Sequence, residues 1–124
     1  MGTELEPPYN SNDIVAALVA NAINAQELFL FTDVEGVCRN YGEADQIRIA
    51  SATITDDWDM LVEACKDETS QSGTGGMYSK ILAGSYFLQH NNDNNTKHLY
   101  IARLHHKEAA ISARSSGTTI KLAA

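Results

Sequence analysis

The sequence predicts an α/β fold, a three-layer sandwich in which helices cover a mainly parallel sheet. Short apolar runs typical of buried strands alternate with longer segments in which apolar residues recur every three or four positions. The apolar run 27–31 directly follows a helical pattern and ends abruptly at polar residues, as strands of parallel sheets do. The 124-residue length, with 44% hydrophobic residues, suits one compact domain.

The first half of the chain supplies a helix, a strand and a weakly patterned region. Ser11, Asn12 and Asp13 are good N-cap types before apolar residues at helical spacing, which predicts a helix over 13–25. "ELFLF" (27–31) predicts a buried strand, and the polar residues after it would lie where ligands bind in open α/β sheets. The alternation of Ile47 and Ile49 suits a minor strand or hairpin.

The second half repeats this alternation. "DDWDMLVEACK" (56–66) predicts a helix whose acidic start favours capping over a catalytic acid cluster, and 77–90 is amphipathic. The asparagine-rich stretch 91–96 is interpreted as a surface insertion without function. Strands are expected at 98–104 and 117–122, with a short helical segment at 108–112 between them.

A glycine-rich turn precedes the amphipathic helix. Helix N-termini expose unpaired amides and a partial positive charge, and glycines let the backbone approach a phosphate closely. Thr74 and Ser79 add hydroxyls, and Lys80 lies within the first turn or so. The spacing differs from that of a Walker P-loop. Phosphate binding and a plain loop before an ordinary helix both remain open on this motif alone.

Three stretches, in the same order, resemble motifs of the glutamate 5-kinases in the amino acid kinase superfamily. "GTGGMYSK" is similar to their G-T-G-G-M-x-[ST]-K signature, "FLFTDVEGV" to their L-L-T-D-x-x-G-L strand and loop, and "YNSNDIVAALVA" to F-G-D-N-D-x-L-S-A-x-V-A. The closing "GTTI" resembles the G-T before the last strand of the kinase domain. The resemblance implies that residues 1–124 are a single partial amino acid kinase domain, the C-terminal nucleotide-binding lobe.

The resemblance also implies an activity: ATP-dependent phosphorylation of the γ-carboxylate of glutamate, the first step of proline synthesis, with Mg²⁺ between the phosphates. Lys80 would neutralise charge on the transferred group, and Asp13 would organise the catalytic lysines. Asn12 would contact glutamate, although Ser11 stands where the family has aspartate. The implied nucleotide-binding residues are Thr32, Asp33, Gly73, Thr74, Gly75, Gly76, Met77, Ser79 and Lys80.

The N-terminal half of the family's kinase domain has no counterpart in these 124 residues. The chain is therefore interpreted as a fragment, as one of two chains that pairs with a separate N-terminal kinase half, or as a degenerate module. We expect little or no kinase activity from it alone, and homo-oligomers through an exposed sheet edge. A non-catalytic nucleotide-binding or assembly module is the alternative function. Sister kinases acting on aspartate, UMP or N-acetylglutamate are alternatives within the enzyme class.

Composition and charge argue against several other classes of function. A formal net charge of −7 argues against nucleic-acid and anionic-membrane partners, and no apolar run approaches membrane-spanning length. Without a signal-peptide pattern or a paired-cysteine motif, the expected location is the reducing cytoplasm. The four histidines are not spaced with cysteines or carboxylates to complete a zinc site, so no metal site is predicted: His90, His98, His105 and His106.

Overall fold

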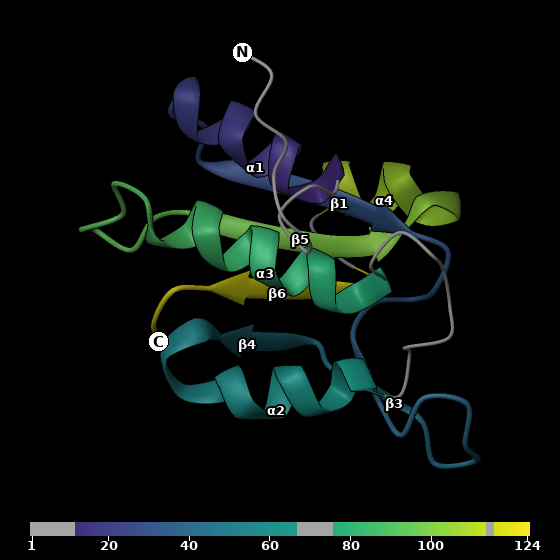
Figure 1. The fold of residues 1–124 in the computed structure, drawn as a ribbon. Helices are drawn as coiled ribbons and strands as arrows, with labels where there is room; N and C mark the ends of the chain where they lie inside the picture. The colour runs from purple at the N-terminus through teal and green to yellow at the C-terminus, as the bar shows by residue number, and fades with distance from the viewer. Residues whose placement is uncertain (1–11, 67–75, 114–115) are drawn as a thin grey trace, which may run out of the picture.

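The computed structural model describes residues 12–66, 76–113 and 116–124. Its elements follow the predicted alternation of helices and strands (Figure 1). In chain order they are α1 (Asn12–Ala22), β1 (Glu27–Thr32), β2 (Cys38–Arg39), β3 (Ile47–Arg48), β4 (Ser51–Thr53), α2 (Ile54–Lys66), α3 (Gly76–Gln89), β5 (His98–Arg103), the 3₁₀ turn η1 (Leu104–His106), α4 (Lys107–Ala113) and β6 (Thr118–Lys121).

The main sheet has the strand order β1-β5-β6-β4. Strands β1 and β5 run parallel, as do β4 and β6, whereas β5 and β6 are antiparallel. The predicted α/β fold with a mainly parallel sheet and flanking helices is confirmed. Because the central pair is antiparallel, the carboxyl ends of β1 and β5 lie together along one edge of the sheet, and the carboxyl ends of β6 and β4 lie along the opposite edge (Figure 1).

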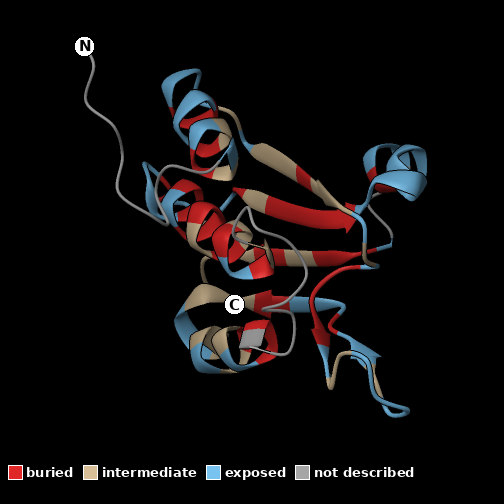
Figure 2. Cartoon of the chain, turned by 45° about the vertical axis from the view of Figure 1, so that its right-hand side comes forward, coloured by how far each residue is buried: buried red, intermediate tan, exposed pale blue. Residues whose placement is uncertain are grey.

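Helices α1, α3 and α2 form one layer over the sheet (Figure 1). Helix α1 contacts β1 and α3, α3 contacts β1 and β5, and α2 contacts β4 and α3. Gly84 permits the close approach of α3 to β5, since a Cβ at this position would overlap the side chain of Leu99. Buried residues concentrate between the helices and the sheet (Figure 2). Among the fully buried side chains there are Leu61, Ile81, Phe87, Leu88, Leu99, Ile101 and Ile120.

Two helix boundaries differ from the predicted ones for identifiable reasons. Helix α1 ends at Ala22 rather than at residue 25, because Asn24 adopts a left-handed conformation (φ 58°) that closes the helix. Helix α2 begins at Ile54, before the acidic run, because Thr53 caps it. The Thr53 hydroxyl accepts from the Asp56 amide, and the Asp57 carboxylate accepts from the Thr53 amide at 2.8 Å. The predicted capping role is thus confirmed for Asp57.

The asparagine-rich stretch does more than the predicted surface insertion. Asn92 is buried, donates to the Leu88 carbonyl at 2.7 Å and accepts from the amides of Thr96 and Lys97. Asn95 donates to the carbonyl of Ala123 at 2.8 Å and accepts from its amide. The stretch therefore ties the end of α3 to the start of β5 and to residues after β6.

Lys97, beside this stretch, is a buried cation with only 2% of its surface exposed. Its ammonium donates to Asn21 Oδ1 at 3.2 Å, to the Phe87 carbonyl at 3.1 Å and to the His90 carbonyl, and lies 4.6 Å from the centre of the Phe87 ring. Burial lowers the pKa of Lys97. Because the Phe87 carbonyl belongs to the last turn of α3 and His90 directly follows the helix, the ammonium caps the negative end of α3.

Thr118, at the start of β6, joins three segments far apart in the sequence. Its buried hydroxyl accepts from the Val37 amide at 2.9 Å and donates to the Ile49 carbonyl at 2.6 Å. The preceding Gly117 has φ +78°, and a Cβ there would overlap the backbone of Ile101 and Ala102. These contacts fix the β2–β3 hairpin against the main sheet. None of the helices in the described ranges has the length and apolar character that crossing a membrane requires.

Candidate active site

The sequence-predicted residues that the structure describes gather at one edge of the sheet. Strands β1 and β5 run in register from Glu27 opposite His98 to Thr32 opposite Arg103, so both end at this edge. Helices α1 and α3 begin at the same edge (Figure 1). The C-terminal edge of parallel strands beside helix N-termini is where α/β folds bind anionic ligands.

The starts of α1 and α3 are joined by an ion pair. Lys80 Nζ lies 3.2 Å from Asp13 Oδ2 and 3.4 Å from Oδ1, and both side chains are largely buried, with exposed fractions of 16% and 17%. Residues 67 positions apart in the sequence are thus in direct contact. Asn12 lies beside this pair, exposed, as the first residue of α1.

Only part of the glycine-rich turn is visible. Gly73, Thr74 and Gly75 lie outside the described residues. Gly76 begins α3 with φ 56°, a left-handed conformation that glycine adopts without strain. Met77 and Ser79 are buried in the protein. A ligand at the start of α3 would therefore meet the backbone at these two positions rather than their side chains.

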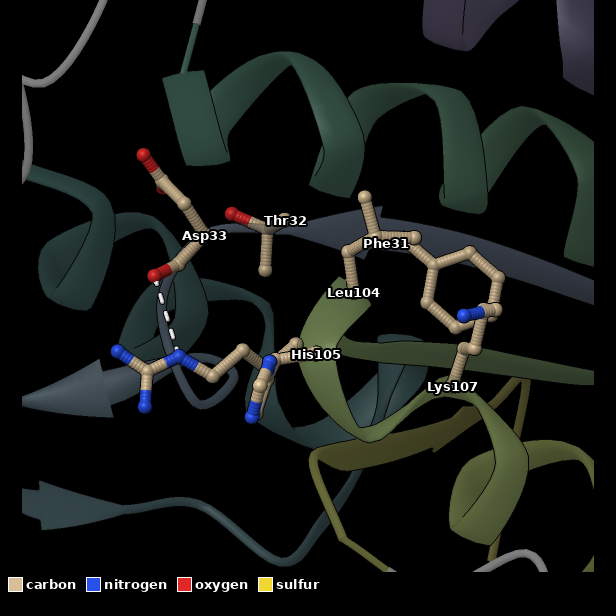
Figure 3. A pocket seen from close by; sticks show the side chains of 7 residues that line it. Phe31, Thr32, Asp33, Leu104, His105 and Lys107 are labelled. Carbon is tan, nitrogen blue, oxygen red and sulfur yellow. Dashed lines mark hydrogen bonds between the residues drawn. The ribbon is translucent and has the colours of Figure 1, made fainter.

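A cleft of about 780 Å³ opens beside the ends of β1 and β5 (Figure 3). Thr32 and Asp33 lie at one end of the cleft, and Phe31 and Lys107 lie together at the other. Its remaining lining comes from Arg103 at the end of β5 and from the η1 residues Leu104 and His105. Arg103 Nε donates to the Asp33 backbone carbonyl at 3.4 Å, the dashed line of Figure 3, which joins the two strand ends.

Sequence reasoning identified Thr32 and Asp33 but missed the second wall of this cleft. His105 and Lys107 follow a predicted strand just as Thr32 and Asp33 do, and Arg103 lies near the end of that strand. Polar residues at a strand end were therefore a usable signal. What the sequence did not reveal is that β1 and β5 are neighbours, because about 65 residues separate them.

The histidines do not assemble into a metal centre within the described ranges, where no three histidine, cysteine or acidic side chains converge. His105 and His106 form an edge-to-face ring pair, and the ring of His98 stacks on that of Tyr100. Phosphate groups, if bound at this edge, would meet backbone amides and a lysine.

Sequence comparison identifies the family of the chain. Residues 2–102 match the amino acid kinase family. A glutamate 5-kinase from Oceanobacillus iheyensis is 34% identical over 82 residues, covering 63% of this chain and 21% of that protein. A carbamate kinase from Thermoplasma acidophilum is 32% identical over 108 residues, covering 87% of this chain and 32% of that protein. The chain thus spans a third or less of the length of either relative.

Solved structures agree on the fold. A Giardia lamblia carbamate kinase bound to AMP-PNP superposes on 89% of this chain and 35% of its own, with a TM-score of 0.64 and 24% identity. A uridylate kinase from Archaeoglobus fulgidus covers 87% of this chain with a TM-score of 0.56 and 17% identity. The described fold is therefore that of amino acid kinases, and the sequence match over residues 2–102 makes the chain a member of the amino acid kinase family.

Proposed function

We propose that this chain is the nucleotide-binding lobe of a glutamate 5-kinase-like phosphotransferase. The observation that carries the proposal is the contact between Lys80 and Asp13, at the edge where β1 and β5 end and α1 and α3 begin. This edge offers the positive end of α3 and an ammonium group to one anion. A nucleoside triphosphate, expected to be ATP, has the charge and the size to use both this edge and the adjoining cleft.

The proposed division of labour follows from position. Lys80 would interact with the oxygens of the transferred phosphoryl group, and Asp13 would hold the Lys80 ammonium in place between turnovers. Thr32 and Asp33 offer a hydroxyl and a carboxylate for the ribose or the base. In the reaction, an acceptor carboxylate oxygen would bond to the γ-phosphorus while the bond to the β–γ bridging oxygen breaks, and the nucleoside diphosphate would leave with the electron pair.

In this proposal Mg²⁺ would be bound mainly by the phosphates of the nucleotide. Mg²⁺ is commonly held by phosphate oxygens, waters and one or two carboxylates. In the described ranges no cluster of acidic side chains provides a separate cage for it. Mg²⁺ would neutralise phosphate charge, while the residues of this edge would position the phosphates.

Glutamate is the preferred acceptor because "GTGGMYSK" follows the glutamate 5-kinase signature and because glutamate 5-kinases of two species are 34% and 35% identical to this chain over 82 and 78 residues. Carbamate is the second candidate, since the carbamate kinase match extends over 87% of the chain. Both acceptors present an anionic oxygen to the γ-phosphorus, so either use would need the same lysine.

The test of the proposal is nucleotide binding followed by turnover. MgATP at one hundred times its dissociation constant would stabilise the chain by about 2.7 kcal/mol and raise its melting temperature by several degrees. Lys80→Ala should abolish this rise, whereas Lys121→Ala, which removes a lysine from β6, should retain it. Absence of any MgATP effect on the unchanged chain would refute nucleotide binding.

Acyl-phosphate formation then separates the enzyme from the alternative module. We expect the 124-residue chain alone to turn over glutamate or carbamate little or not at all. Adding the N-terminal half of a relative's kinase domain should restore turnover if the chain supplies a catalytic lobe. Nucleotide binding that no such addition converts into turnover would favour the non-catalytic module.

A further inference from the structure

We propose that the outer face of helices α1 and α3 is a contact surface for a second copy of this chain. This α1–α3 face is defined by six large apolar side chains: Val15, Leu18, Val19, Ile23, Tyr78 and Tyr86. The proposal goes beyond the proposed function and does not depend on nucleotide binding. It assigns self-association to the helix layer rather than to the edge of the sheet.

The residues of the α1–α3 face come from two helices that pack side by side. Helices α1 and α3 contact each other and cover the same side of the sheet (Figure 1). On α1, Val15, Leu18 and Val19 recur at spacings of three and four residues, so they share one side of the helix. Tyr86 follows Tyr78 at a multiple of the same spacing, so the two tyrosines share one side of α3. The other sides of both helices are buried, so these side chains face outward.

The exposure of this face is unusual for apolar residues. All six side chains are exposed, with exposed fractions from 39% to 70%. Single exposed apolar residues are common on soluble proteins, whereas a group of them on neighbouring helices marks an interaction surface. Helix α1 also buries Ile14, Ala17 and Ala20 on its inner side, so it is apolar on both sides. A helix that is apolar all round is normally buried all round.

The α1–α3 face also lacks formal charge. No aspartate, glutamate, lysine or arginine occurs in residues 14–26 or in residues 81–92. The charged residues at the starts of the two helices, Asp13 and Lys80, neutralise each other in their ion pair. Helix α2, by contrast, exposes three acidic side chains: Asp56, Asp59 and Glu63. The uncharged surface is thus a property of α1 and α3 and not of the helix layer as a whole.

This distribution of charge favours a second copy as the occupant. The chain has a net charge of −7, so two copies repel each other wherever their charged surfaces meet. A two-fold contact brings the same patch of both copies together, and like charges placed opposite each other weaken such a contact strongly. The α1–α3 face avoids this repulsion. Its composition, apolar with tyrosines and without charges, is that of the core of a homodimer interface.

Other occupants match the face less well. Helices that lie on a membrane surface usually carry lysine and arginine beside their apolar side, and α1 contains neither residue. A strongly acidic or basic protein partner is selected by complementary charge, which this face does not offer. A second copy needs only an apolar surface that complements itself.

Sedimentation equilibrium of the 124-residue chain without nucleotide, from about 1 to 200 μM, tests the proposal. We expect a monomer–dimer equilibrium in this range. Val19→Glu and Tyr86→Glu each place an unpaired carboxylate in the contact, on α1 and on α3 respectively. Each should raise the dissociation constant by about a hundredfold or more. Ile111→Glu adds the same charge at an exposed apolar residue of α4, outside the face, and should leave the dissociation constant unchanged.

Each outcome decides the proposal. An unchanged chain that is monomeric at all concentrations overturns it. A dimer that persists in both Val19→Glu and Tyr86→Glu overturns it as well, because the contact would then lie elsewhere, such as at the sheet edge. Equal weakening by Ile111→Glu overturns it too, since added charge alone would then be responsible. Weakening confined to the two face variants supports it.

The variants must be folded for these outcomes to count. Glutamate is a good helix former, so both substitutions at exposed helix positions should keep the melting temperature within about 2 °C of that of the unchanged chain. Val15→Glu replaces a variant that fails this criterion, because Val15 belongs to the same face. The measurement uses no nucleotide, so its failure would leave the proposed function standing.

Discussion

Replacing Lys97 with methionine tests whether a buried cation stabilises this fold. Methionine retains the length of the side chain but removes the donors that reach Asn21 Oδ1 and the carbonyls of Phe87 and His90. Hydrogen bonds to charged groups contribute about 1.5–3 kcal/mol each, and a buried acceptor that loses its partner costs about 1–3 kcal/mol. Part of this loss is offset, because methionine has no charge to desolvate and because water can partly hydrate the carbonyls of Phe87 and His90. We expect a net loss of about 3 kcal/mol.

Equilibrium unfolding in urea measures this loss. With a slope of about 1–3 kcal/mol per molar urea for a chain of this size, the midpoint should fall by about 1–3 M at an unchanged slope. Lys107→Met, which removes an exposed lysine, is the control and should change stability by less than about 0.5 kcal/mol. A Lys97→Met variant as stable as the unchanged chain would refute the reasoning, since desolvation would then outweigh the three bonds.

A double variant identifies the origin of the loss. Asn21 Nδ2 is buried and, in the described part of the structure, lacks a hydrogen-bond partner, while Asn21 Oδ1 accepts from Lys97. Replacing both partners of a buried hydrogen bond by apolar groups can be nearly neutral, whereas replacing one leaves the other unsatisfied. Asn21→Leu combined with Lys97→Met should therefore be less destabilising than the sum of the single variants, by about 1 kcal/mol.

Three further predictions concern stability. Thr118→Val should cost about 2–4 kcal/mol in urea unfolding, because a buried amide and a buried carbonyl would both lose their partner, whereas Thr118→Ser should retain most of it. Gly84→Ala should lower the melting temperature, since its Cβ would overlap Leu99 and push α3 from the sheet, and Leu99→Ala should partly rescue that variant. Burial lowers the pKa of Lys97, so between its folded pKa and the ordinary value of about 10.4 the unfolded chain binds more protons. Stability relative to Lys97→Met should therefore rise as pH rises through that window, and a flat or falling difference would contradict the direction.

Periodicity predicted the elements of this fold that bury an apolar face. The helix over 77–90 and the strand 27–31 have unmistakable apolar spacing, and the structure places both within one or two residues of the expected bounds. Helix boundaries that depend on a single polar residue were harder to predict. Thr53 caps α2 and Asn24 ends α1 through local hydrogen bonding and backbone conformation, which apolar spacing does not record.

Long-range polar contacts were the least predictable features. Nothing in the spacing of Lys97 distinguishes it from an exposed lysine, because its partners on α1 and α3 come from segments 76 and 10 positions earlier in the chain. The cleft is a similar example. Polar residues after β1 and after β5 were each visible in the sequence, but only the parallel pairing of these strands makes them opposite walls of one pocket.

The contact between Lys80 and Asp13 makes anion binding an exchange reaction. A phosphate that binds Lys80 must first displace the Asp13 carboxylate, which belongs to a different helix. The binding free energy gained at α3 is therefore reduced by the loss of the Lys80–Asp13 ion pair. A phosphate seated there would loosen the opening turn of α1, and faster amide hydrogen exchange at Ala16 and Ala17, whose amides face the carbonyls of that turn, would reveal the displacement on nucleotide addition. Occupancy of the phosphate position would thereby reach Asn12, the proposed contact of glutamate, through the first turn of α1 alone.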